Sequence, residues 1–283
     1  MSLPVKKIYV DSRYMTNDSV STSNFKFQLP RNVFLPQNTV FYLEDVCIPH
    51  SWYTVEPGFN DTLYVYYQST DAKNGIWVLT IPTDNYTGTT LAGQIQTLLK
   101  TNIDNNFTAS YGINRNNITI SLTTSTVKFK ILSDDELILG GVASAYPLHN
   151  TTAINFNMLN SCNDLIGNTN TSTTVCDSTN PFTSGMLDLL SIRNIFISSP
   201  NLGSFSTMGA RGESNIIKKV PVSSDFGYLI IDSFTSPHDF LDCSKLTLGT
   251  IEFALRDVKG NYIPLHGGHV SFSIVFSAVN MDT

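Results

Sequence analysis

The feature that most constrains the fold of this chain is a repeated alternation of apolar and polar residues with a period of two. Near the C-terminus, Val270, Phe272, Ile274 and Phe276 alternate with serines. Because successive side chains of a β-strand point to opposite faces, this pattern predicts a strand with one buried and one exposed face. We therefore expect a mainly β chain, with Ser271, Ser273 and Ser277 on a polar face.

The same signals predict strands along most of the sequence. They fall at residues 25–29, 40–48, 63–67, 77–81, 118–120, 127–132, 192–197, 216–222, 228–231 and 251–255. Pro30 is expected to end the first of these strands and Pro49 to stop or bend the second, since proline donates no hydrogen bond to a sheet. Residues 257–261 supply turn residues before a short return at 262–265.

The middle of the chain has a different character. Thr90 begins the best helical pattern, with Leu91, Ile95, Leu98 and Leu99 on one face. Residues 133–136 form a capping box that predicts a short helical turn through Leu139, ended by Gly140. Residues 168–184 are rich in Thr, Ser and Asn and are expected to form an exposed loop.

These patterns together predict a single jelly-roll β-sandwich with an inserted small α+β domain. Residues 1–60 and 185–283 would form the jelly roll, and residues 61–184 the insertion. Jelly rolls pair strands that are distant in sequence, as this arrangement requires.

Charge and composition argue against several classes of protein. The formal net charge of -6 and the pI near 5.2 give no basic footprint, so direct nucleic-acid binding through a cationic surface is not expected. The N-terminus lacks the apolar core of a secretory signal, and no apolar run is long enough to span a bilayer, so an intracellular origin is expected. Without a secretory signal, the seven Asn-x-Ser/Thr triplets are best explained by an Asn- and Thr-rich composition.

The cysteines are widely spaced, which favours buried free thiols at Cys47, Cys162, Cys176 and Cys243.

Patterns that suggest chemistry each have a simpler explanation. His266 and His269 have a metal-like spacing but no acidic or cysteine partner nearby, and the acids at 134–136 are explained by helix capping. The glycines at 203–212 match no phosphate-binding motif, and no serine lies in a nucleophile elbow. The aromatic residues at 52–53 and 64–67 are interpreted as core or interface packing rather than a sugar site. We therefore expect no catalytic or metal-binding residue and no cofactor, and predict that the chain is not an enzyme.

Five segments carry a resemblance to a known family. They are Tyr9–Ser12, Ser23–Leu29, Val40–Tyr53, Leu79–Tyr86 and Leu248–Gly260, and the Ile-Pro-x-Ser-Trp-Tyr stretch at 48–53 is the most specific. These residues resemble the minor capsid (penton) proteins of virophages and Polinton/Maverick-type viruses. The resemblance implies a single jelly roll that forms homopentamers at the vertices of an icosahedral virion, assembled inside the host cell. It also implies contact with a separate double-jelly-roll major capsid protein.

Interface residues were predicted from local chemistry alone. The N-terminal arm contributes Lys6, Lys7 and Arg13, and two loops that mix aromatic, glycine and charged residues contribute Phe205, Met208, Arg211, His238 and Phe240. The alternative is a carbohydrate- or receptor-binding jelly roll that acts in host attachment, with its site in the inserted domain. Both functions can coexist if the insertion touches the host surface.

Overall fold

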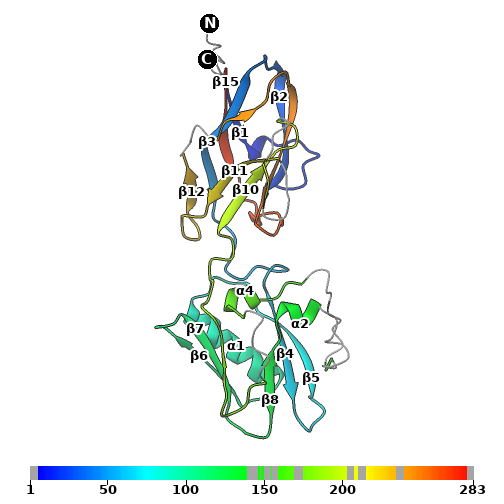
Figure 1. Ribbon diagram of the computed structural model, residues 1–283, viewed down its shortest axis with the longest axis vertical. Helices are drawn as coiled ribbons and strands as arrows, with labels where there is room; N and C mark the ends of the chain where they lie inside the picture. The colour runs from blue at the N-terminus through cyan, green and yellow to red at the C-terminus, as the bar shows by residue number, and fades with distance from the viewer. Residues whose placement is uncertain are drawn as a thin grey trace. The chain divides into compact units, whose positions relative to one another are not determined.

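A computed structural model describes residues 6–138, 146, 148–149, 154, 159–168, 175–202, 207–209, 215–233 and 239–278 (Figure 1). The chain divides into two compact units. One contains Met1–Trp52 and Ile192–Thr283, and the other is Tyr53–Ser191.

The first unit consists of two antiparallel sheets. Its elements are β1 (Lys6–Asp11), the 3-10 turn η1 (Ser12–Tyr14), β2 (Asn24–Phe34), β3 (Thr39–Pro49), β10 (Asn194–Ser198), β11 (Ile216–Pro221), β12 (Leu229–Asp232), β13 (Leu241–Asp242), β14 (Thr247–Arg256) and β15 (Ser271–Ala278). One sheet has the order β1-β15-β3-β12, with β13 also paired to β3, and the other has the order β11-β10-β14-β2.

This strand order is that of a jelly roll. Leaving aside the two-residue β13, eight strands lie in the described part of this unit. Counted along the chain, the first, eighth, third and sixth form one sheet, and the fifth, fourth, seventh and second form the other. The first and last strands of the chain are neighbours, with Lys6 opposite Phe276 and Asp11 opposite Ser271 (Figure 1). The predicted fold class, mainly β with a single jelly roll and an inserted α+β domain, is therefore confirmed.

The core between the two sheets is built from the inward residues of the alternating strands. Phe253 of β14 is 1% exposed, and its ring lies 5.4 Å from that of Phe25 in the same sheet. It also makes an edge-on contact, at 4.9 Å, with Phe272 of the facing sheet. These aromatic contacts join the two sheets.

The outer face of β15 differs from the prediction. Ser273 and Val275 belong to this face, yet they are only 3% and 4% exposed. β15 lies between β1 and β3, and Lys7 and Tyr42 flank Val275 on either side. The Nζ atom of Lys7 lies 2.5 Å from a carboxylate oxygen of Glu44, so an ion pair bridges the two strands that flank β15. A small residue on a central strand is thus covered by its long neighbours, which periodicity alone does not show.

Two further strand predictions need correction or refinement. Pro30 does not end β2, which continues to Phe34; β2 is an edge strand, where a missing backbone donor is tolerated. In β3, Asp45 has a φ of 52°, and the pairing with β15 shifts register between Ser271 and Ser273. This bulge lets both Glu44 and Asp45 lie outside the core, while the inward set changes from Phe41 and Leu43 to Val46 and Ile48.

The second unit is a small α+β domain with its own core. It contains β4 (Thr62–Gln68), β5 (Gly75–Thr80), α1 (Gly88–Asn102), β6 (Phe107–Gly112), β7 (Asn117–Leu122), β8 (Lys128–Ile131), α2 (Asp134–Ile138), α4 (Asn163–Ile166) and β9 (Phe182–Thr183). Its sheets have the orders β5-β4-β8 and β6-β7-β9. Helix α1 packs on β6 and β7, and its Leu91, Ile95 and Leu99 are fully buried (Figure 1).

The helical predictions hold in this unit, but the loop prediction is partly wrong. Thr87 caps α1 in a reciprocal box with Thr90, so the helix begins at Gly88 rather than at Thr90. The Ser133 capping box is also present, because the backbone N–H of Ser133 donates to Glu136 at 3.0 Å; Leu139 and Gly140 lie outside the described residues. Within 168–184, Phe182 is buried and starts β9, and Cys176 pairs with Phe129. This polar segment therefore contains two residues of the domain's hydrophobic core, Cys176 and Phe182.

We predict that Phe253→Ala lowers the free energy of unfolding of the jelly roll by about 3–5 kcal/mol, because a cavity replaces a ring in contact with both sheets. Chemical denaturation followed by intrinsic fluorescence measures the change. Phe34→Ala is the matched control: this side chain is 61% exposed, so its loss should change stability little. Equal effects of the two substitutions would contradict the packing described here.

Candidate functional site

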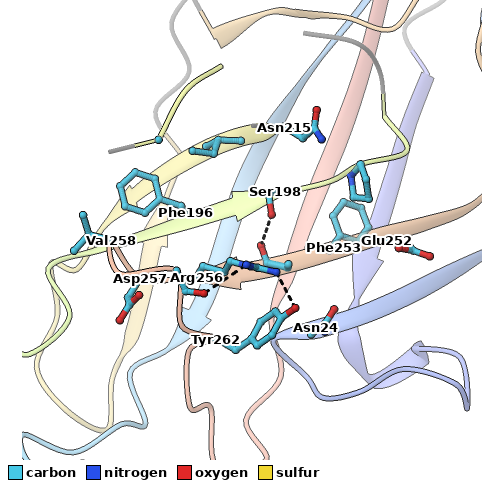
Figure 2. Close-up of a pocket in the computed structure, with 15 residues that line it drawn as sticks. Asn24, Phe196, Ser198, Asn215, Glu252, Phe253, Arg256, Asp257, Val258 and Tyr262 are labelled. Carbon is cyan, nitrogen blue, oxygen red and sulfur yellow. Dashed lines mark hydrogen bonds between the residues drawn. The ribbon is translucent and has the colours of Figure 1, made fainter. Parts of the chain in front are cut away.

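The jelly roll carries a pocket on the outer face of the β11-β10-β14-β2 sheet. It has a volume of about 390 Å³ and is bordered by β10, β14 and the turn that follows β14 (Figure 2). Its most exposed aromatic side chain is Tyr262, at 40%. Figure 2 shows Phe196 and Ser198 on one wall and Arg256 with Tyr262 on another.

Arg256 is the central charged group of this pocket. Its Nη2 donates to the hydroxyl of Tyr262 at 2.8 Å, and its guanidinium lies 4.5 Å from the centre of the Tyr262 ring. The turn that places Tyr262 is held by Asp257, which accepts from the backbone N–H of Asn261 at 2.8 Å. Arginine stacked on an aromatic ring is a common recognition element at interfaces.

The polar side chains of this pocket have partners within the chain. Histidine and cysteine are absent from the described residues of its lining, and the Ser198 hydroxyl donates to the carbonyl of Ala254. Of its carboxylates, Asp257 is held in the turn and Glu252 lies 3.8 Å from Lys26.

The remaining candidates for chemistry have structural roles. A ring nitrogen of His269 lies 3.2 Å from the hydroxyl of Ser12, and His266 occupies a turn with a φ of 47°. Throughout the described residues, no group of three or more His, Cys, Asp or Glu is placed to hold a metal ion. Of the aromatic cluster, Trp52, Tyr64 and Tyr67 are at most 5% exposed, as expected for core packing. No helix in the described part of the chain is long and apolar enough to cross a membrane.

The cysteines are free, and three of the four are buried. Burial raises the pKa of Cys162 and of Cys243 to about 12 and that of Cys176 to about 11. Cys47 on β3 is half-buried. A thiol with so high a pKa is almost entirely protonated at neutral pH and is a poor nucleophile.

We predict that a thiol-specific reagent at pH 8 modifies only Cys47 in the folded protein, whereas all four cysteines react in denaturant. Mass spectrometry of the modified peptides measures this. Cys47→Ser is the control and should abolish the rapid phase. Rapid modification of Cys162 under native conditions would show that its surroundings are more open than described.

The predicted interface residues lie at several separate places. Lys6 and Lys7 are on β1, the outermost strand of its sheet, and Arg13 follows in η1, where it pairs with Asp11 at 2.5 Å. Met208 is 86% exposed, and Phe240, next to β13, stacks on Tyr42 of β3 at 5.0 Å. Phe205, Arg211 and His238 lie outside the described residues. The structure thus brings the N-terminal arm and Phe240 to the same sheet, and Met208 to the loop before β11.

Sequence reasoning missed two features of the jelly-roll surface. One is the pairing of Arg256 with Tyr262, which no motif predicts. The other is the exposure of β12, which was expected as a strand at 228–231 but lies at a sheet edge, with Leu229 and Ile231 55% and 61% exposed and Tyr228 just before it 69% exposed. The signal in the sequence was an apolar run, Tyr228–Ile231, without the alternation of a half-buried strand.

Comparison with known proteins supports the fold. The chain is similar to the solved structure of the mavirus penton protein, with a TM-score of 0.50 and 9% sequence identity. The alignment covers 98% of this chain and 100% of that one, so both units are included. No protein-family model matches the sequence, and a search of curated proteins gives no match. At this identity the likeness defines the fold, a jelly roll with an inserted domain.

Proposed function

We propose that the chain is a structural capsid protein, a penton or minor capsid protein that forms homopentameric vertices of an icosahedral virion. The observation that carries this proposal is the full-length likeness to the mavirus penton protein, which extends over the jelly roll and the insertion alike. Four of the five segments that resemble penton proteins in sequence fall on β1, β2, β3 and β14 of the jelly roll, and the fifth, Leu79–Tyr86, lies between β5 and α1 of the second unit.

In this proposal the jelly roll, expected from sequence at residues 1–60 and 185–283, is the capsid domain, and the α+β unit, expected at residues 61–184, is the inserted domain. The vertex assembles by head-to-tail contact between identical subunits. Such contacts close into a ring of five when each subunit is rotated by a fifth of a turn relative to the one before it. A separate double-jelly-roll major capsid protein surrounds the ring. The protein is therefore expected in the virion, at the capsid vertex, after assembly in the host cell.

We predict that the purified full-length chain forms a ring of five subunits. Native mass spectrometry gives the mass of the assembly directly, and negative-stain microscopy shows its symmetry. The control is the same measurement at several concentrations and with the major capsid protein added. A chain that remains monomeric under all these conditions would contradict the penton proposal.

The alternative function, carbohydrate or receptor binding by the inserted domain, remains a separate prediction. This domain has its own hydrophobic core and exposes Ile113, at 78%, in the turn between β6 and β7. Glycan-array binding by the full-length chain, and its loss on Ile113→Asp, would support a role in attachment. Such binding would be compatible with a vertex protein.

A further inference from the structure

The β1-β15-β3-β12 sheet has two edges that no strand covers among the described residues. β1 pairs only with β15, and β12 pairs only with β3. An uncovered edge presents backbone N–H and C=O groups that can pair with another chain, unless charge, proline or a covering segment prevents it. These two edges lie on opposite sides of one sheet, which is the arrangement that a head-to-tail contact needs.

Both edges expose apolar side chains on the outer face of the sheet. On β1, Tyr9 is 73% exposed. On β12, Leu229 and Ile231 are 55% and 61% exposed, while Ile230 between them is fully buried. Exposed large apolar side chains on an edge strand are normally avoided in a protein that stays monomeric.

The charges of the two edges are complementary. Residues 6–13 carry Lys6, Lys7 and Arg13 against a single acid, Asp11. Residues 225–242 carry four aspartates and no lysine or arginine; they are Asp225, Asp232, Asp239 and Asp242. Within the chain Lys7 pairs with Glu44 at 2.5 Å, Arg13 with Asp11 at 2.5 Å and Asp232 with Lys218 at 3.7 Å. The excess of cations in one segment and of acids in the other is therefore a property of these two stretches of sequence. Opposite signs favour contact between the two edges over contact of either edge with itself.

The backbone of each edge defines which residues offer hydrogen bonds. Ser12 donates to Val270 on the β15 side, so alternation along β1 directs the backbone groups of Tyr9 and Lys7 away from β15. The carbonyl of Tyr228 accepts from His50 on the β3 side, so Leu229 and Ile231 direct theirs away from β3. Pro49, which has no N–H, lies opposite Leu229, as this assignment requires.

We propose that β1 of one copy pairs antiparallel with β12 of a second copy, with Tyr9 opposite Leu229 and Lys7 opposite Ile231. This inference deepens the proposed self-assembly and rests on it. In this register all four residues direct their backbone groups to the contact, and their side chains lie on the same outer face of the extended sheet. Lys6 then lies opposite Asp232, and the turn that contains Arg13 lies toward Asp225, so unlike charges meet at both ends.

Cysteine cross-linking of the full-length chain tests this register. Residues that exchange hydrogen bonds across antiparallel strands have Cα atoms about 5.5 Å apart, within the range of a disulfide. The double variant Tyr9→Cys/Leu229→Cys should therefore give, on oxidation, a ladder of covalent oligomers that ends at the closed ring. The matched control is Tyr9→Cys/Phe34→Cys, since Phe34 is equally exposed but lies on β2 of the other sheet. The wild-type chain is oxidised in parallel because it contains Cys47.

The outcomes separate this inference from the proposed function. A wild-type chain that forms rings, with a ladder only in the Tyr9/Leu229 pair, supports both. If the wild-type chain forms rings but the Tyr9/Leu229 pair gives no ladder, or the control pair gives the same ladder, the register is overturned and the penton proposal still stands. A ladder that stops at dimers overturns the head-to-tail contact. A wild-type chain that never self-associates contradicts the penton proposal itself, and a different capsid protein would then be the candidate for this edge.

Introduction of charges at the two edges provides a second test that does not depend on oxidation. Leu229→Lys should weaken self-association about tenfold or more, because it adds a cation beside Lys7 and removes an apolar contact. Tyr9→Asp in the same chain should restore association by placing an acid opposite the new lysine. Phe34→Lys is the control and should leave association unchanged. Failure of Tyr9→Asp to restore association would overturn the register, and a loss with Phe34→Lys equal to that with Leu229→Lys would overturn the choice of surface.

Discussion

The structure depends on the pairing of the last strand of the chain with the first. β15 lies between β1 and β3, so the sheet that contains both termini forms only when residues about 260 positions apart in the sequence meet. The entropy of closing such a loop is recovered from the burial of Phe272, Ile274 and Phe276 against the second sheet. Without β15, β1 would lose its only strand partner and the jelly roll would remain open.

The insertion between β3 and β10 is compatible with this closure because it brings its own core. Leu91, Ile95 and Leu99 of α1 are buried within the second unit, so this unit does not depend on apolar surface from the jelly roll. Loop-closure entropy grows only slowly with length, so a folded insertion at this position costs the sandwich little. The inserted domain therefore need not disturb the register between β3 and β15.

The same sheet that closes the fold also presents the surface proposed for assembly. Its centre is covered by long side chains and by the ion pair of Lys7 with Glu44, whose hydrogen bond raises the pKa of Lys7 above its ordinary value. Its edges retain uncovered backbone and apolar side chains at Tyr9, Leu229 and Ile231. A monomeric protein would be expected to protect such edges, and the contrast between a covered centre and open edges is consistent with a protein that functions by association.

The sequence by itself determined the β class, most strands and the helix at Leu91–Leu99, because these follow from the local periods of side-chain direction. It did not determine that Ser273 is covered, that Pro30 stays within a strand or that Phe182 pairs with β7, because each depends on which strand lies alongside. The bulge at Asp45 likewise depends on the register with β15. Only the tertiary structure placed Arg256 against Tyr262, and made Tyr9 and Leu229 opposite edges of one sheet. Neighbours across a sheet are set by topology, and topology brings together residues that local sequence patterns cannot relate.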